Sequence, residues 1–183
     1  FRAAGLRAGI YYSLLDWHHP DFVIDNIYGP YRDLSEEERK EKNKKRDMRR
    51  YAQYMRNQVT ELLTLYGKID LLWFDFSYAW HPDTPADPEK GKGHCQWESE
   101  ALLATVRSLQ PDILVNDRLD LVGSGDFYTP EQRLPEPGEP QKQGTPEMWE
   151  SCQTFSGSWG YFRDELTWKS GRQCIDMLIN CVS

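Results

Sequence analysis

The sequence contains no CxxC pair and no cluster of histidines and cysteines at the spacing of zinc ligands. Its four cysteines are scattered, which favours free and mostly buried thiols, with a single disulfide as the open alternative. The G-x-G-x-x-G fingerprint and the P-loop are also absent, which weakens any nucleotide-binding interpretation. No apolar run is long enough to span a membrane.

Positive charge is scarcer than negative charge. The 183 residues carry 22 Lys and Arg against 29 Asp and Glu, a formal net charge of -7. The charged stretch from Arg39 to Arg50 fits a solvated helix face, and no basic face is interleaved with aromatics, so a nucleic-acid partner is disfavoured. Aromatic residues are abundant at 13%, with seven Trp and ten Tyr, enough for a sizeable core and for stacking on flat ligands.

The stretch Lys68–Phe76 (KIDLLWFDF) is the centre of the predicted fold. Its nearly continuous apolar run predicts a strand buried on both faces, which is typical of parallel sheets covered by helices. Asp75 stands at the carboxyl end of this strand, where α/β folds place their chemistry. The alternative is a turn or N-cap aspartate that closes the strand.

The rest of the chain alternates strands and helices. We expect strands over 6–15, 69–76, 113–115 and 149–154, a helix that begins at Ser35, and helices over 51–66, 96–109 and 167–181. Such alternation predicts parallel strands with crossover connections, either half of an eight-stranded barrel or an open doubly wound sheet. Because the pattern starts near a helix end and stops in mid-helix, we expect residues 1–183 to be the middle of a larger domain.

Polar residues lie at or near each predicted strand. His18 and His19 follow the first strand, Asp75 stands at the end of the second, Arg118 follows the third, and Glu150 lies near the fourth. In a barrel these strand ends converge on one pocket. Metal binding by the adjacent histidines is disfavoured, because neighbouring side chains rarely face the same way and no third ligand is near. Hydrogen bonding to a polar ligand and plain exposed loop histidines both stay open.

Two carboxylates in such a pocket favour glycoside hydrolysis, in which one attacks the sugar and the other protonates the leaving oxygen. Asp75 suits the first role because a strand end holds it rigidly. Glu131 suits the second on its loop, although a surface acid beside a proline is the alternative. The other candidates would bind the sugar through hydrogen bonds or ring stacking: Arg118, His18, His19, Trp73 and Trp159.

Five segments, in the same order, resemble those of α-L-fucosidases of glycoside hydrolase family 29. They are 9–20 (GIYYSLLDWHHP), 54–76 (YMRNQVTELLTLYGKIDLLWFDF), 115–118 (VNDR), 125–131 (GDFYTPE), and 149–150 with 158–161 (WE and SWGY). The resemblance implies a retaining exo-α-L-fucosidase on a partial (β/α)8 barrel of the α/β class, which contributes only the middle strands and helices. Its substrates would be glycans or glycoconjugates with terminal α-L-fucose, and no metal or organic cofactor is implied.

The resemblance also assigns roles. Asp75 matches the nucleophile that forms a covalent fucosyl intermediate, and Glu131 matches the acid/base of many members, with Glu150 as the second candidate. His18 and His19 match paired histidines that bind fucose hydroxyls, while Trp73 and Arg118 match residues of the sugar pocket. A secreted, periplasmic or lysosomal location is typical of the family.

Two departures from the family pattern stand out. Phe76 occupies a position after the nucleophile that is usually glycine, and its ring is expected to narrow the pocket or alter the backbone. The chain also lacks the family's first strands and its closing segment, so we expect an incomplete catalytic domain over residues 1–183, poorly stable and weakly active by itself. The alternatives are another barrel glycosidase, such as a galactosidase or hexosaminidase, and a catalytically impaired carbohydrate-binding homologue. The oligomeric state stays open.

Overall fold

The structure is a computed structural model that describes residues 2–78, 87–136 and 148–182. Its central element is a parallel sheet with strand order β1 (Gly9–Ser13), β2 (Leu71–Asp75) and β3 (Leu114–Val115). Ser13 pairs with Asp75, and Leu72 pairs with Val115, so the carboxyl ends of the strands lie along one edge. Within the described residues the sheet is open, so the expected α/β class with parallel strands is confirmed, whereas no closed barrel is formed.

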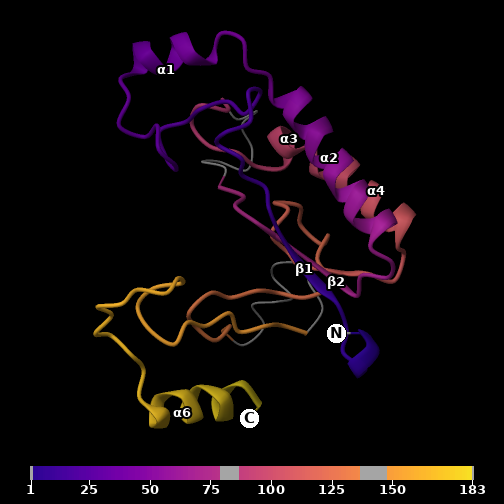
Figure 1. The fold of residues 1–183 in the computed structure, drawn as a ribbon, viewed down its shortest axis with the longest axis vertical. Coiled ribbons are helices and arrows are strands. Elements are labelled where there is room, and N and C mark those ends of the chain that lie inside the picture. The colour runs from indigo at the N-terminus through magenta and orange to yellow at the C-terminus, as the bar shows by residue number, and fades with distance from the viewer. Residues whose placement is uncertain (1, 79–86, 137–147, 183) are drawn as a thin grey trace.

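Three helices cover one side of the sheet. Figure 1 shows α2 (Met48–Leu65), α3 (His94–Trp97) and α4 (Ser99–Leu109) together on that side, while α6 (Gly171–Val182) lies apart near the C-terminus. The predicted helix over 96–109 is in fact two helices, because Glu98 adopts a left-handed φ of 48° between them. The last helix begins four residues later than predicted, after Ser170, whose hydroxyl accepts from the Gln173 N–H.

The charged segment after Ser35 forms a separate helix, α1 (Glu36–Asn43), with no buried residue. Ser35 and Glu38 make a reciprocal capping box, which satisfies two backbone N–H groups at the start of this helix. Asp47 then caps α2 through the Arg49 N–H. The helix ends before Gly67, whose φ of 74° lies in the left-handed region that glycine adopts most readily and that terminates the helix.

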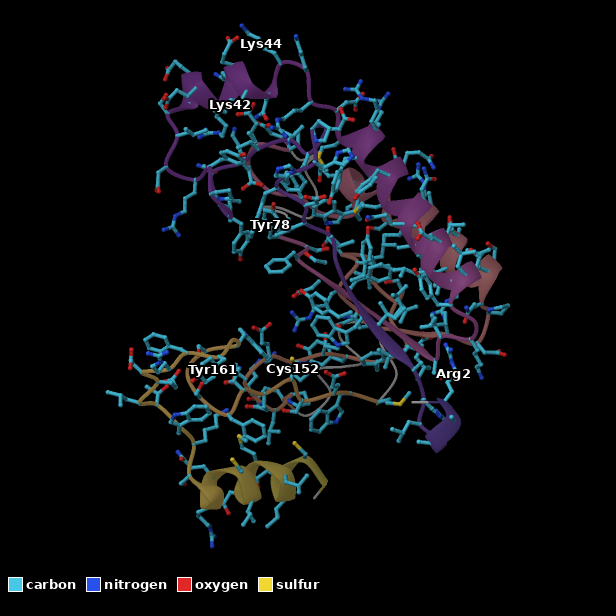
Figure 2. The ribbon with its side chains drawn as sticks, viewed as in Figure 1. Arg2, Lys42, Lys44, Tyr78, Cys152 and Tyr161 are labelled. Atoms are coloured by element: carbon cyan, nitrogen blue, oxygen red, sulfur yellow. The ribbon has the colours of Figure 1, made fainter. Side chains whose placement is uncertain are left out.

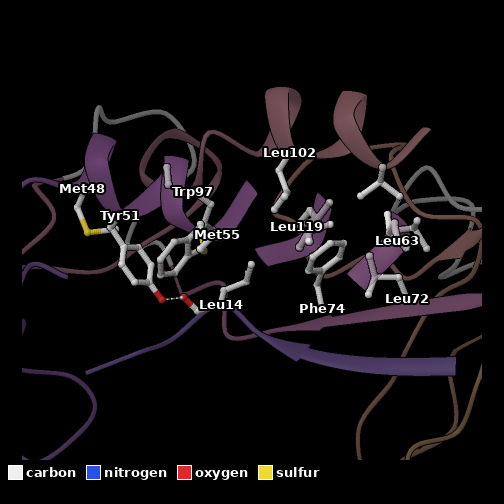
Figure 3. Packing of buried hydrophobic residues seen from close by; sticks show 14 of the residues in the cluster. Leu14, Met48, Tyr51, Met55, Leu63, Leu72, Phe74, Trp97, Leu102 and Leu119 are labelled. Atoms are coloured by element: carbon white, nitrogen blue, oxygen red, sulfur yellow. Dashed lines mark hydrogen bonds between the residues drawn. The ribbon is translucent and has the colours of Figure 1, made fainter. Parts of the chain in front are cut away.

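The core lies between α2, α4 and the sheet (Figure 3). Met55 and Val59 of α2, Leu102 of α4 and Phe74 of β2 are all fully buried. Each such side chain stabilises the fold by roughly 1.5–3 kcal/mol relative to an exposed one. The buried Tyr51 also donates from its hydroxyl to the Leu14 carbonyl at 2.9 Å, which ties α2 to the end of β1.

Several expectations need correction. The predicted strand over 149–154 forms only isolated parallel bridges, Tyr128 with Trp149 and Glu131 with Cys152. The opening helix is a short 3-10 turn at Arg2–Ala4. All four cysteines are free, as expected, but none is buried: Cys95 is exposed, and Cys152, Cys174 and Cys181 are half-buried. Among the described residues no helix is long and apolar enough to cross a bilayer.

Candidate active site

A cavity of about 950 Å³ opens at the carboxyl ends of β2 and β3. Figure 2 shows Tyr78 and Cys152, which both line it, on opposite sides of the opening. Six of the eight residues predicted for the site line this cavity: Trp73, Asp75, Arg118, Glu131, Glu150 and Trp159. The convergence follows from the parallel sheet, which brings the ends of different strands to one edge.

Asp75 is held by three donors. Its Oδ2 accepts from the Tyr11 hydroxyl at 2.8 Å, and its Oδ1 accepts from the Phe76 N–H at 2.9 Å and from Arg118 Nη1 at 3.3 Å. Burial, together with the hydrogen bond to Asp75 and its charge, raises the pKa of Tyr11, so this hydroxyl keeps its proton and donates it. The carboxylate is therefore oriented before any ligand arrives.

Arg118 joins the two predicted catalytic carboxylates. Its Nη1 lies 3.3 Å from Asp75 Oδ1 and 2.9 Å from Glu131 Oε2, and its guanidinium lies over the Trp73 ring at 4.6 Å. Since both oxygens approach the same nitrogen, these two oxygens are at most about 6 Å apart.

Thr129 fixes the Arg118 side chain from behind. Its hydroxyl accepts from Arg118 Nε at 2.9 Å and donates to Asp117 Oδ1 at 2.6 Å, and its carbonyl accepts from Arg118 Nη2 at 3.0 Å. The same Asp117 oxygen accepts from the Thr129 N–H at 3.1 Å. The guanidinium is thus oriented by a half-buried network that leaves Nη1 for the two carboxylates.

Glu150 lies in a different environment from Glu131. Burial raises the pKa of the half-buried Glu150, an effect that the Trp73 indole and the charge of Arg118 only partly oppose. The Trp73 Nε1–H is buried and lies near the Glu150 carboxyl group. Because burial is the largest effect on its pKa, Glu150 is a carboxyl group suited to holding a proton.

His18 and His19 do not line the cavity in the part of the chain that the structure describes. The Asp16 carboxylate accepts from both of their backbone N–H groups at 3.0 and 3.2 Å and turns the chain just after β1. The His19 ring then packs at 4.2 Å on the Tyr54 ring of α2, and its Nδ1 accepts from the Asp21 N–H at 3.1 Å. Their role in sugar binding stays a prediction.

The sequence pattern missed several lining residues: Tyr11, Tyr28, Tyr78, Asp117, Asp120 and Cys152. Tyr11 could have been found from the sequence, because it lies on the predicted strand over 6–15. In the structure it pairs in register with Trp73 of β2, and the two rings stack at 5.7 Å. Tyr28 and Tyr78 come from loops whose path no periodicity encodes. No group of three or more metal-binding side chains occurs among the described residues.

Comparison with known proteins gives a consistent result. A family model described as Alpha-L-fucosidase matches residues 1–183. The tissue alpha-L-fucosidase of Mus musculus is 26% identical over 192 residues, covering 100% of this chain and 35% of the relative. The Homo sapiens protein of the same name is 27% identical over 171 residues, covering 89% of this chain and 29% of the relative.

Solved structures are similar as well. Alpha-L-fucosidase isoenzyme 1 from Paenibacillus thiaminolyticus is 39% identical with a TM-score of 0.80, over 100% of this chain and 42% of that one. Alpha-L-fucosidase AlfC from Lactobacillus casei, solved with the α-L-fucose product, is 26% identical with a TM-score of 0.63, over 98% of this chain and 50% of that one. The chain therefore spans half or less of the length of these relatives.

Proposed function

The chain belongs to the alpha-L-fucosidase family. We propose that the protein releases terminal α-L-fucose from glycans with retention of configuration. The catalytic domain would be a (β/α)8 barrel to which β1–β3 and α2–α4 contribute. The observation that carries the proposal is the pair of carboxylates, Asp75 and Glu131, held by one guanidinium nitrogen. A close pair of carboxylates is the arrangement that retaining glycosidases use. AlfC, solved with the α-L-fucose product, supports the substrate class.

Asp75 is proposed as the nucleophile. Its carboxylate attacks the anomeric carbon of fucose and forms a covalent fucosyl ester, while the glycosidic bond breaks and the leaving oxygen takes a proton from the acid. Water, deprotonated by the same residue, then attacks the anomeric carbon and releases fucose and the Asp75 carboxylate. The Tyr11 hydroxyl and the Phe76 N–H hold the carboxylate in place for attack.

The acid/base is proposed at Glu131, with Glu150 as the second candidate. Glu131 belongs to the loop that carries the family resemblance, but its carboxylate is engaged by Arg118 and must release that contact to deliver a proton. Glu150 is better suited to carrying a proton, because burial raises its pKa and thereby favours the protonated form. Substrate binding that displaces the Arg118 contact would restore Glu131 to the role.

The nucleophile is tested with Asp75→Asn, which keeps the size of the side chain. We expect the purified protein to lose at least ~10³-fold in kcat on 4-nitrophenyl α-L-fucopyranoside while still binding fucose. Asp112→Asn, at an exposed position before β3, is the matched control and should retain full activity. Proton NMR of the first-formed sugar tests the stereochemistry: α-L-fucose supports retention, and β-L-fucose would refute it.

The acid/base is tested with Glu131→Gln and Glu150→Gln. Removal of the true acid should slow a methyl fucoside far more than the 4-nitrophenyl fucoside, because 4-nitrophenolate leaves without protonation. Added azide should restore turnover in that variant by attacking the fucosyl intermediate in place of deprotonated water. If both variants lose activity equally on the two substrates, neither residue is the proton donor.

A second candidate function is a carbohydrate-binding homologue with impaired catalysis. One observation favours it: Phe76, directly after Asp75, has a left-handed φ of 75° and lines the cavity. Under this reading the wild type would bind fucose without turnover, and Asp75→Ala would leave the affinity for the sugar nearly unchanged. Calorimetric titration with L-fucose, run beside the activity assay, separates the two functions.

A further inference from the structure

The cavity has an aromatic wall that the catalytic proposal does not use. It consists of Tyr28, Phe76 and Tyr78, hereafter the Tyr28 wall, and all three line the cavity. The Tyr28 ring meets Phe76 at 5.9 Å and Tyr78 at 4.8 Å, with interplanar angles of 76° and 86°. Tyr28 is 43% exposed, so this edge-on cluster faces open space rather than a filled core.

Two members of the Tyr28 wall, Phe76 and Tyr78, offer ring carbon rather than hydrogen-bonding groups. The Tyr78 hydroxyl donates to Asp25 Oδ2 at 2.7 Å, and Asp25 is itself buried and paired with Lys92. The hydroxyl is therefore directed into the protein, which leaves the ring carbons for the cavity. Phe76 has no polar group on its side chain. A ligand that contacts this wall must present a flat, apolar surface.

Phe76, a member of the Tyr28 wall, has a left-handed backbone conformation. Its φ of 75° lies in the left-handed region, which is costly for a residue with a Cβ relative to glycine. Strained residues of this kind cluster at functional sites. The Phe76 N–H donates to Asp75 Oδ1 at 2.9 Å, and its ring packs edge-on against Tyr28.

The other side of Asp75 has the opposite chemistry. Tyr11 donates to the Asp75 carboxylate, and Arg118 lies over the Trp73 ring. Polar donors above an aromatic floor suit a sugar with several hydroxyl groups. The two sides of one cavity therefore divide into a polar part and an apolar part, with Asp75 between them.

From this division we propose that the Tyr28 wall is the leaving-group subsite, and that it takes a flat ring through its carbon face: an aryl group or the apolar face of a hexose. The inference rests on the proposed function, since it places the fucosyl unit on the Trp73 side. Phe76 and Tyr28 would then determine which fucosides this protein prefers. The aryl group of 4-nitrophenyl α-L-fucopyranoside is the probe, and methyl α-L-fucopyranoside is its counterpart without a ring.

The test uses Tyr28→Ala and Phe76→Leu, the latter with a side chain of similar volume and no aromatic ring. We expect either variant to lose about tenfold in kcat/KM on the aryl fucoside and less than twofold on the methyl fucoside, as fits an aromatic contact. Inhibition by free L-fucose should be unchanged, because fucose does not reach the wall. Tyr31→Ala, in the same loop but outside the cavity lining, is the matched control.

Three results would overturn the subsite. Equal losses on both fucosides would show a general effect on the active site. Weaker inhibition by L-fucose would place the sugar on the wall, and unchanged kinetics on both substrates would show no contact at all.

If the wild type releases no fucose from either substrate, the proposed function fails separately. The subsite is then judged by calorimetry: a Tyr28→Ala loss of affinity for the aryl fucoside alone supports it, and equal affinities refute it.

Discussion

The buried ion pair of Lys92 and Asp25 is expected to stabilise the loops beside the cavity, and a substitution of Lys92 tests this. The Lys92 ammonium group is fully buried, donates to Asp25 and to the Pro88 carbonyl, and lies 4.5 Å from the centre of the Phe22 ring. Replacing Lys92 with Met keeps most of the side-chain length and removes the charge. Asp25 would then remain buried without a cationic partner.

The expected loss follows from this environment. Removing one partner of a buried ion pair destabilises a protein by about 3–5 kcal/mol, because the other charge stays buried. Asp25 keeps three donors, the Tyr78 hydroxyl at 2.7 Å and the N–H groups of Ile27 at 2.9 Å and Tyr28 at 3.1 Å. We therefore expect the lower end, about 3 kcal/mol, which corresponds to a fall in Tm of roughly 6–12 °C for a domain of this size.

Urea denaturation of the wild type, Lys92→Met and the double variant Asp25→Asn/Lys92→Met measures the effect. The double variant should recover part of the loss, because no charge is left unpaired. A loss below 1 kcal/mol in Lys92→Met, or a double variant no more stable than Lys92→Met, would refute this account of the pair.

The same pair gives a dependence on pH. Burial lowers the pKa of Lys92 from 10.5 to about 8, although the charge of Asp25 and its hydrogen bond act to raise it. Between these two values the unfolded chain binds more protons than the folded chain, so the titration of Lys92 makes the free energy of unfolding rise with pH. The Met variant should lose this slope, which a series of urea titrations from pH 7 to 10 would detect.

Three further predictions concern the site and its support. Thr129→Val removes the hydroxyl between Asp117 and Arg118, so kcat/KM should fall about tenfold in kinetic assays, whereas Thr129→Ser should retain it. Gly125→Ala would place a Cβ 2.7 Å from the Asp117 Cα, so urea denaturation should show a loss of about 1–3 kcal/mol. The pKa of Glu150 is raised in the folded state above the value near 4.5 of the unfolded chain. Its protonation therefore stabilises the fold below pH 4.5, and this contribution is lost as the pH rises through the folded pKa. Glu150→Gln should abolish this dependence in thermal melts at different pH.

The sequence predicted the site best where strands deliver residues directly. Asp75 ends β2, and Arg118 follows β3 by three residues, so the parallel register alone brings them to one edge of the sheet. Glu131 and Glu150 reach the same cavity because their segments run beside one another through the isolated bridges. Strand position in the sequence therefore carried most of the information about the site.

Prediction was weakest where hydrogen bonds local to a loop decide the path of the chain. His18 and His19 follow a strand as clearly as Asp75 does, yet the Asp16 carboxylate captures both of their N–H groups and the His19 ring packs against α2. Glu98 likewise breaks a well-formed helical pattern with its left-handed φ. Apolar periodicity records which face is buried, but it encodes neither the hydrogen bonds to the Asp16 carboxylate nor the backbone turn at Glu98.

Phe76 stands where the family usually has glycine, and the structure shows a physical consequence of this difference. The sequence predicts only that a bulky residue replaces a small one beside the nucleophile. The φ of 75° adds a physical reason for a glycine at this position, because glycine adopts left-handed backbone without the steric cost of a Cβ. A chain that keeps phenylalanine in this conformation does so at a cost in backbone strain, and its ring gains the contact with Tyr28. Phe76→Gly should therefore raise stability and at the same time reduce the preference for aryl leaving groups, and this opposite response distinguishes a ring retained for binding from one that merely fills space.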